Sequence, residues 1–170
     1  MDKYLCSQKV DWVKVDNIVE TYLSDSIPSA IDCVSVYAFV LKEGKFLQTE
    51  LRKGERPTQR LDIPGGHVDE GETSEQAVIR ETLEETGVIV KVRKFVAYKK
   101  ITIIGPKPEN YRYPYPTGYM GFYICDIVEE LHFEGNEETL GRIWLEQKDF
   151  AISPWCIENK ILFDEVLKQI

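Results

Sequence analysis

Seven acidic side chains and a single arginine lie between residues 69 and 85 of this 170-residue chain, so this stretch holds six of the chain's eight net negative charges. The acids are Asp69, Glu70, Glu72, Glu75, Glu81, Glu84 and Glu85, and the arginine is Arg80. Most charge runs are solvated surfaces, but such surfaces usually interleave lysine, and this one has none. Because Mg²⁺ is typically held by a few carboxylates together with substrate phosphates, the pattern indicates a site for a hard divalent cation.

Four of these acids, Glu75, Glu81, Glu84 and Glu85, fall on a predicted helix from Thr73 to Thr86. Thr73 and Gln76 form a capping box, no Gly or Pro interrupts the segment, and Gly87 stands where a left-handed C-terminal cap belongs. At 100° per residue one face carries Arg80, Glu81, Glu84 and Glu85, and the opposite face carries Val78, Ile79, Thr82, Leu83 and Thr86. We therefore expect the second face to pack on the core and the first to carry the chemistry.

The turn before this helix contains Pro64, Gly65 and Gly66. Glycine adopts backbone conformations closed to other residues and lets main-chain carbonyls approach a ligand closely. A tight turn without any ligand is the simpler interpretation of the same residues.

The spacing of this whole stretch resembles the Nudix box of the Nudix hydrolases. Five residues separate Gly66 from Glu72, seven more precede Arg80-Glu81, two more precede Glu84-Glu85, and one more precedes Gly87-Val88. Thr82 departs from the pattern, since an apolar residue usually follows the Arg-Glu pair.

The resemblance implies an α/β fold, the Nudix α/β/α sandwich with a mixed β-sheet. It implies that Gly65 (through its carbonyl), Glu84 and Glu85 bind Mg²⁺ or Mn²⁺, and that Glu81 is a ligand or the general base. It also implies that Arg80 orients the carboxylates and that Glu72 pairs with Arg80 or reaches a second ion. Candidate contacts further from the helix are Glu138 for the metal, and Arg52, Arg60 and Gly66 for the substrate.

The expected activity is divalent-metal-dependent hydrolysis of the pyrophosphate bond in a nucleoside diphosphate linked to another moiety. A nucleoside triphosphate is the default substrate. The competing interpretation is a catalytically silent Nudix-like domain that binds a nucleotide or sugar-phosphate as a sensor. The complete set of Glu72, Arg80, Glu81, Glu84 and Glu85 weighs against it.

Composition narrows the choice of partners. The 43% hydrophobic content is that of one globular domain, and a net charge of −8 with a pI near 4.9 argues against bulk nucleic acid or an anionic membrane surface. The four cysteines are scattered without metal-ligand spacing, which favours buried thiols in a reducing cytoplasm. No long apolar run indicates a membrane span or a secretion signal. With this net charge, a phosphorylated small molecule is compatible only where metal ions screen it, and the small nucleotide substrate is what the resemblance implies.

The remaining segments supply the predicted framework. Residues 31–170 form the expected Nudix domain, with strands at 33–41, 45–51, 88–104, 118–128 and 142–145. Residues 1–30 are interpreted as a helical extension packed on the domain or as a contact in a homodimer. A C-terminal helix begins at Pro154, and its expected buried stripe is Ile157, Ile161, Leu162, Val166 and Leu167.

The proline- and tyrosine-rich loop at 105–118 contains Tyr111, Tyr113 and Tyr115. Its tyrosines are compatible with a lid that stacks on a nucleobase, because aromatic side chains stack well on bases. A packed surface loop is the favoured interpretation.

Overall fold

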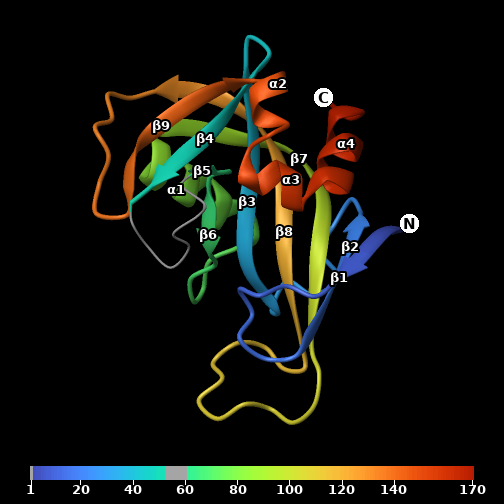
Figure 1. The fold of residues 1–170 in the computed structure, drawn as a ribbon. Helices are drawn as coiled ribbons and strands as arrows, with labels where there is room; N and C mark the ends of the chain where they lie inside the picture. The colour runs from blue at the N-terminus through green and yellow to red at the C-terminus, as the bar shows by residue number, and fades with distance from the viewer. Residues whose placement is uncertain (1, 53–60) are drawn as a thin grey trace.

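The computed structural model describes residues 2–52 and 61–170. Its strands are β1 Lys3–Gln8, β2 Asn17–Leu23, β3 Cys33–Lys42, β4 Lys45–Leu51, β5 Leu61–Asp62, β6 Gly65–His67, β7 Val88–Ile103, β8 Thr117–Glu130 and β9 Thr139–Glu146. Its helices are α1 Ser74–Thr86, α2 Gln147–Phe150, α3 Pro154–Glu158 and α4 Lys160–Leu167. Figure 1 shows these elements from the N-terminus in blue to the C-terminus in red.

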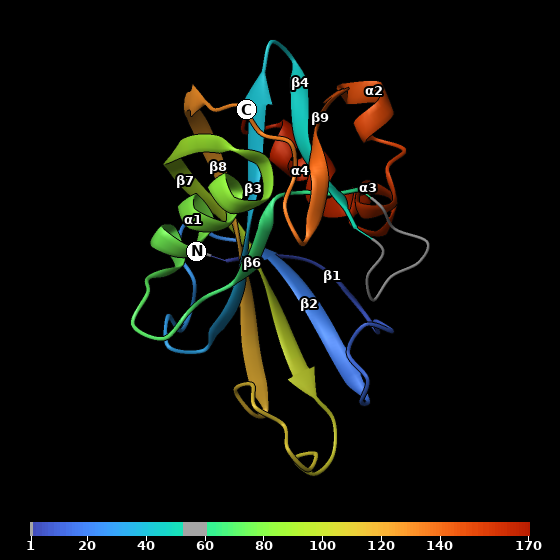
Figure 2. The ribbon, with the colours of Figure 1, turned by 90° about the vertical axis from the view of Figure 1, so that its left-hand side faces the viewer.

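The strands form a mixed sheet in the order β1-β2-β7-β8-β3-β4-β5, with β6 paired to β3 and β9 paired to β4. Strands β3 and β8 are parallel, and the other pairs are antiparallel. Figure 2 shows α1 on one side of the sheet and α2, α3 and α4 on the other. The predicted α/β/α arrangement is therefore confirmed.

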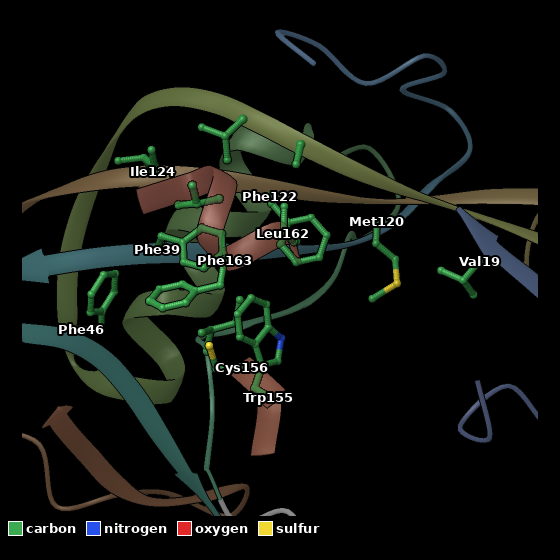
Figure 3. Packing of buried hydrophobic residues seen from close by; sticks show 14 of the residues in the cluster. Val19, Phe39, Phe46, Met120, Phe122, Ile124, Trp155, Cys156, Leu162 and Phe163 are labelled. Carbon is green, nitrogen blue, oxygen red and sulfur yellow. The ribbon is translucent and has the colours of Figure 1, made fainter. Parts of the chain in front are cut away.

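Alternation along β3 divides the core between the two sides of the sheet. Val36, Ala38 and Val40 pack in the cluster that contains Ala77 and Val78 of α1. The opposite cluster lies under α3 and α4 and is rich in aromatic side chains: Phe39, Phe46, Phe122, Phe150, Trp155 and Phe163 (Figure 3). Because successive side chains of a strand point to opposite faces, one strand supports both helical layers.

The acidic helix forms as predicted. The Thr73 hydroxyl accepts a hydrogen bond from the Gln76 amide at 3.2 Å, the Gln76 side chain accepts from the Thr73 amide at 2.9 Å, and Gly87 is left-handed at φ 68°. Thr82 is fully buried, and its hydroxyl donates to the Val78 carbonyl at 2.7 Å. The residue that departs from the family pattern therefore packs without an unsatisfied polar group.

The expectation of a helical N-terminal segment is wrong, because this segment forms β1 and β2. β2 pairs along its length with β7, with Val19 opposite Ile101 and Tyr22 opposite Tyr98. Backbone pairing with a strand about 80 residues away therefore replaces the local hydrogen bonds of a helix. The loop between the two strands is held by Asn17, the first residue of β2. Its side-chain Nδ2 donates to the carbonyls of Val10, Val13 and Val15 and so fixes residues 10–15 in an irregular conformation.

The predicted C-terminal helix is interrupted, and part of its predicted buried stripe is therefore wrong. Asn159 ends α3 and precedes α4; its side chain donates to the Trp155 carbonyl and accepts from the Lys99 ammonium of β7. Because of this break, the residues of α4 do not continue the helical repeat of α3. Leu162 and Val166 are buried as expected, whereas Ile157 and Ile161 are 66% and 51% exposed. The buried partners that the prediction missed are Trp155, Cys156 and Phe163.

No helix within residues 2–52 and 61–170 combines the length and the apolar character that crossing a membrane requires.

Candidate active site

Arg80 lies at the centre of the acidic face of α1. Its Nε and Nη2 donate to both carboxylate oxygens of Glu72, at 2.9 and 2.8 Å. Its Nη1 donates to Glu81 at 2.8 Å and to Glu84 at 3.1 Å, and Nη2 also donates to the His67 carbonyl at 2.9 Å. A guanidinium carries five N–H donors, so these contacts use its full capacity. Arg80 therefore fixes three carboxylates relative to the glycine turn.

Ion pairing and burial shift the carboxyl pKa values of this face in opposite directions. The bond to Arg80 lowers the pKa of Glu72, and the pKa of Arg80 is raised in return. Burial raises the pKa of Glu81 despite its own bond to Arg80. Glu84 is exposed at the outer edge of the face, with 55% of its side chain accessible.

Glu85 is the buried acid of the site. It is 7% exposed, and its Oε2 accepts a hydrogen bond from the Gly65 amide at 2.9 Å. Burial, together with the charges of the neighbouring carboxylates Glu81, Asp62 and Glu138, raises the pKa of Glu85 to about 8, although the hydrogen bond from the Gly65 amide acts to lower it. The segments before α1 and before β9 thus bring carboxylates towards the same helical turn.

The segment predicted as a glycine turn bends at Pro64 and then forms the short strand β6, and a side chain at either glycine would meet a close contact. A Cβ on Gly66 would lie 2.4 Å from the carboxyl carbon of Glu81. A Cβ on Gly65 would lie 2.1 Å from the carbonyl oxygen of Val36 on β3, which pairs with this turn. The absence of side chains at these two positions therefore lets the turn pass between the sheet and the acidic face of α1.

Arg52 and Glu138 lie beside each other in the structure. The Arg52 amide donates to the Glu138 carbonyl at 2.9 Å, and its Nε donates to the Asn136 carbonyl. The structure thus brings together Gly65, Gly66, Glu72, Arg80, Glu81, Glu84 and Glu85. Glu138, in the loop before β9, and Arg52, directly after β4, lie beside each other. Arg60 lies outside the described residues.

The chemistry of these donors fits a hard cation. Carboxylate and carbonyl oxygens are the ligands that Mg²⁺ prefers, and burial raises the pKa of both Glu81 and Glu85, a cost of ionisation that a bound cation would offset. As the side chains stand, no three His, Cys, Asp or Glu residues of the described chain converge closely enough to hold a metal ion. In this arrangement Glu81 and Glu84 are turned to Arg80 instead.

The tyrosine-rich loop reaches the glycine turn through one contact. The rings of Tyr113 and His67 are nearly parallel, with centroids 6.0 Å apart, and Tyr113 Oη lies 3.4 Å from His67 Nε2. Tyr111 packs against the core, and the Tyr115 hydroxyl donates to the Gly105 carbonyl of its own loop. These contacts favour a packed loop.

Sequence reasoning missed Asn136 and Asp62, which adjoin the site. Asp62 lies just before the glycine turn, and Asn136 lies three residues before β9. Gly135 next to Asn136 signals a tight turn, but nothing in the sequence relates that turn to α1.

The fold and the acidic face on α1 together define a Nudix protein. Residues 32–165 match the NUDIX domain family, so the chain belongs to this family. The expectation of a Nudix pyrophosphohydrolase is thereby confirmed at the level of the family.

Relatives support this placement. The chain is 30% identical over 126 residues to an 8-oxo-dGTP diphosphatase from Haemophilus influenzae, in a match that covers 74% of this chain and 84% of the relative. It is 41% identical over 63 residues to an ADP-ribose pyrophosphatase from Methanocaldococcus jannaschii, covering 37% of each. The crystal structure of the Bacillus subtilis pyrophosphohydrolase BsRppH superposes with a TM-score of 0.58 at 26% identity, covering 77% of this chain and 73% of that chain.

Proposed function

We propose that the protein hydrolyses the pyrophosphate bond of a nucleoside diphosphate linked to another moiety, with Mg²⁺ or Mn²⁺ as cofactor. Water adds across the phosphorus–oxygen–phosphorus linkage and yields a nucleotide and a phosphorylated product. The observation that carries this proposal is the pair of carboxylates with raised pKa values, Glu81 and Glu85, held against the glycine turn.

The residues that would hold the cation are the Gly65 carbonyl, Glu81, Glu84 and Glu85, with Glu138 as a further ligand. When bound, the cation would neutralise phosphate charge and lower the pKa of water. Arg80 orients the carboxylates, and Glu72 fixes Arg80 through its bidentate pair.

Two arginines are the candidate substrate contacts. Arg52 and Arg60 are the proposed phosphate contacts, since a guanidinium matches phosphate oxygens bidentately. Gly66 carries no side chain that would obstruct a phosphate next to Glu81.

A nucleoside triphosphate is the first candidate substrate. The Haemophilus influenzae relative is named for a nucleoside triphosphate, 8-oxo-dGTP, and the archaeal relative for ADP-ribose. Both names describe a pyrophosphate linkage attached to a nucleoside, which is the chemistry we propose. Small nucleotides, rather than nucleic acids or membranes, are the proposed partners.

We also propose that the protein acts in the cytoplasm. Its four cysteines are free thiols, and Cys33, Cys125 and Cys156 are buried. Burial raises the pKa of the Cys33 and Cys156 thiols to about 11, so they are poor nucleophiles at neutral pH. Assembly as a homodimer is a separate prediction, and light scattering coupled to size-exclusion chromatography measures it directly.

The decisive experiment measures hydrolysis across a panel of nucleotide classes with Mg²⁺ or Mn²⁺ and with EDTA. Turnover is expected only with the metal, and Glu84→Gln or Glu85→Gln should reduce it by orders of magnitude because each removes a carboxylate ligand. Glu75→Gln is the matched control, since Glu75 is an exposed acid in the first turn of the same helix. Nucleotide binding without hydrolysis of any class would instead identify a sensor, and near wild-type rates in both site variants would refute the assignment.

A further inference from the structure

The loop before β9 joins three parts of the proposed site at one residue, Asn136. Its side-chain Nδ2 donates to the Glu84 carbonyl at the end of α1, at 2.7 Å. Its Oδ1 accepts from the amides of Glu138 and Thr139, both at 2.9 Å. Its main-chain carbonyl accepts from Arg52 Nε. One side chain therefore connects the helix that carries Glu84 with the loop that carries Glu138.

The loop backbone is shaped for this connection. Gly135 has φ +90°, and a Cβ there would lie 2.6 Å from the carbonyl oxygen of Thr139. The Asn136 amide donates to that same carbonyl at 2.9 Å, which closes the turn. Thr139 is fully buried, and its hydroxyl donates to the Glu85 carbonyl at 3.1 Å. The turn is thus tied to the last turn of α1 through two consecutive carbonyls, those of Glu84 and Glu85.

This tie restrains the backbone that carries Glu138. The hydrogen bonds to the Glu84 and Glu85 carbonyls fix the loop that carries Glu138 against the last turn of α1. Glu138 is exposed, and without a restraint on its backbone it would move into solvent. The Asn136 Oδ1 restrains that backbone directly through the Glu138 amide.

We propose that Asn136 is a positioning residue that holds Glu138 in reach of the cation site formed by the carboxylates of α1. This inference rests on the proposed function, because it assigns Glu138 to metal binding. Ligand-orienting residues of this kind typically contribute about 10–100-fold to metal affinity or activity.

The test is a double-mutant cycle on Mn²⁺ affinity, measured by calorimetry and electron paramagnetic resonance on the substrate-free protein. Asn136→Ala should weaken Mn²⁺ binding by about 10–100-fold, and Glu138→Ala should do the same. In the double variant the loss should be no greater than in Glu138→Ala alone, because Asn136 acts through Glu138. Glu137→Ala, an exposed neighbour in the same turn, is the control and should bind Mn²⁺ as the wild type does.

Near-ultraviolet circular dichroism establishes that each variant is folded. If Asn136→Ala is not, Asn136→Ser takes its place in the cycle, since serine keeps a short acceptor for the turn amides and lacks the amide Nδ2 that bonds the Glu84 carbonyl. Additive losses in the cycle, or unchanged Mn²⁺ affinity in the folded Asn136 variant, would overturn the inference. Because the measurement needs no substrate, absence of turnover on the nucleotide panel contradicts only the proposed reaction.

Discussion

Glu72 and Glu85 belong to one acidic cluster, yet their surroundings give them opposite proton affinities. Glu72 receives two bonds from Arg80, which lower its pKa. Glu85 is enclosed by protein, and burial together with nearby carboxylate charges raises its pKa to about 8 despite the hydrogen bond from the Gly65 amide. A buried carboxylate without a cation is destabilising when ionised, and therefore the folded protein without metal keeps a proton on Glu85 at neutral pH.

This elevated pKa leads to a prediction about stability and pH. In the unfolded chain Glu85 ionises near its ordinary pKa of 4.5, whereas in the folded chain it ionises near 8. Below pH 4.5 the group is protonated in both states and has no effect. Between these pH values folding requires proton uptake, so the contribution of Glu85 becomes increasingly unfavourable and is constant above pH 8. Glu85→Gln should therefore gain stability over the wild type as the pH rises, in EDTA.

Urea unfolding of both proteins between pH 4 and 9 measures this difference. Glu84→Gln serves as the control, because Glu84 is an exposed residue on the same helical turn. Adding Mn²⁺ at pH 8 should reverse the order of stability, since the cation stabilises the folded state that binds it. A difference between Glu85→Gln and the wild type that does not change with pH would contradict the burial argument.

The two ends of α1 are held in different ways. Its N-terminus is closed by the local capping box of Thr73 and Gln76. Its C-terminus receives partners from other elements: Arg142 of β9 donates to the Thr86 carbonyl at 2.8 Å, and Thr139 donates to the Glu85 carbonyl. The last turn of α1 has no basic residue of its own, so Arg142 supplies the positive charge that a helix C-terminus favours. The acidic face is therefore oriented by β9 and its preceding loop.

The loop at 105–118 is expected to be a packed element. Tyr113 contacts His67, and Tyr115 is bonded within the loop, so both side chains already have protein partners. Tyr113→Ala and Tyr115→Ala should leave KM and kcat unchanged on the substrate found in the nucleotide panel. A raised KM with unchanged kcat would instead show that these rings contribute binding energy to the nucleotide, as a lid would.

At the scale of the whole molecule, the N-terminal strands β1 and β2 are part of the central sheet. Val19 of β2 is completely buried in the aromatic-rich core cluster, and Tyr22 stacks on Tyr98 of β7 with centroids 5.0 Å apart. Such contacts give the N-terminal hairpin a share in the stability of the domain. The division at residue 30 between an extension and a Nudix domain stays a prediction.

A matched pair of substitutions measures how much the N-terminal hairpin contributes to the stability of the domain. Val19→Thr should lower the free energy of unfolding by about 1–3 kcal/mol, because it buries a hydroxyl in an apolar cluster. Ile18→Thr is the control: Ile18 is 40% exposed on the opposite face of the same strand, and its replacement should change stability by less than about 0.5 kcal/mol. Both variants keep a β-branched side chain, so strand propensity is nearly constant. Equal effects in denaturant unfolding would mean that the hairpin is not integral to the core.

The sequence by itself determined the features that depend on neighbours a few residues apart. The capping box at Thr73, the left-handed Gly87 and the acidic face through Glu85 are local, because a helix brings residues three and four apart onto one side. The strands at 33–41 and 45–51 were likewise predictable from composition and the turn between them. These elements also carry the residues on which the family assignment depends.

Only the tertiary structure decided the features that join distant segments. Residues 17–23 became a strand because β7 offered hydrogen-bond partners, and the C-terminal helix broke at Asn159, where Lys99 of β7 meets its side chain. The elevated pKa of Glu85 arises from burial and from the charges of Asp62 and Glu138, which approach it only in the folded chain. Asn136 joins that site through the Glu84 carbonyl, 52 positions away in the sequence. Desolvation and long-range pairing arise only once the chain has packed. They therefore cannot be predicted from the spacing of residues that are close in the sequence.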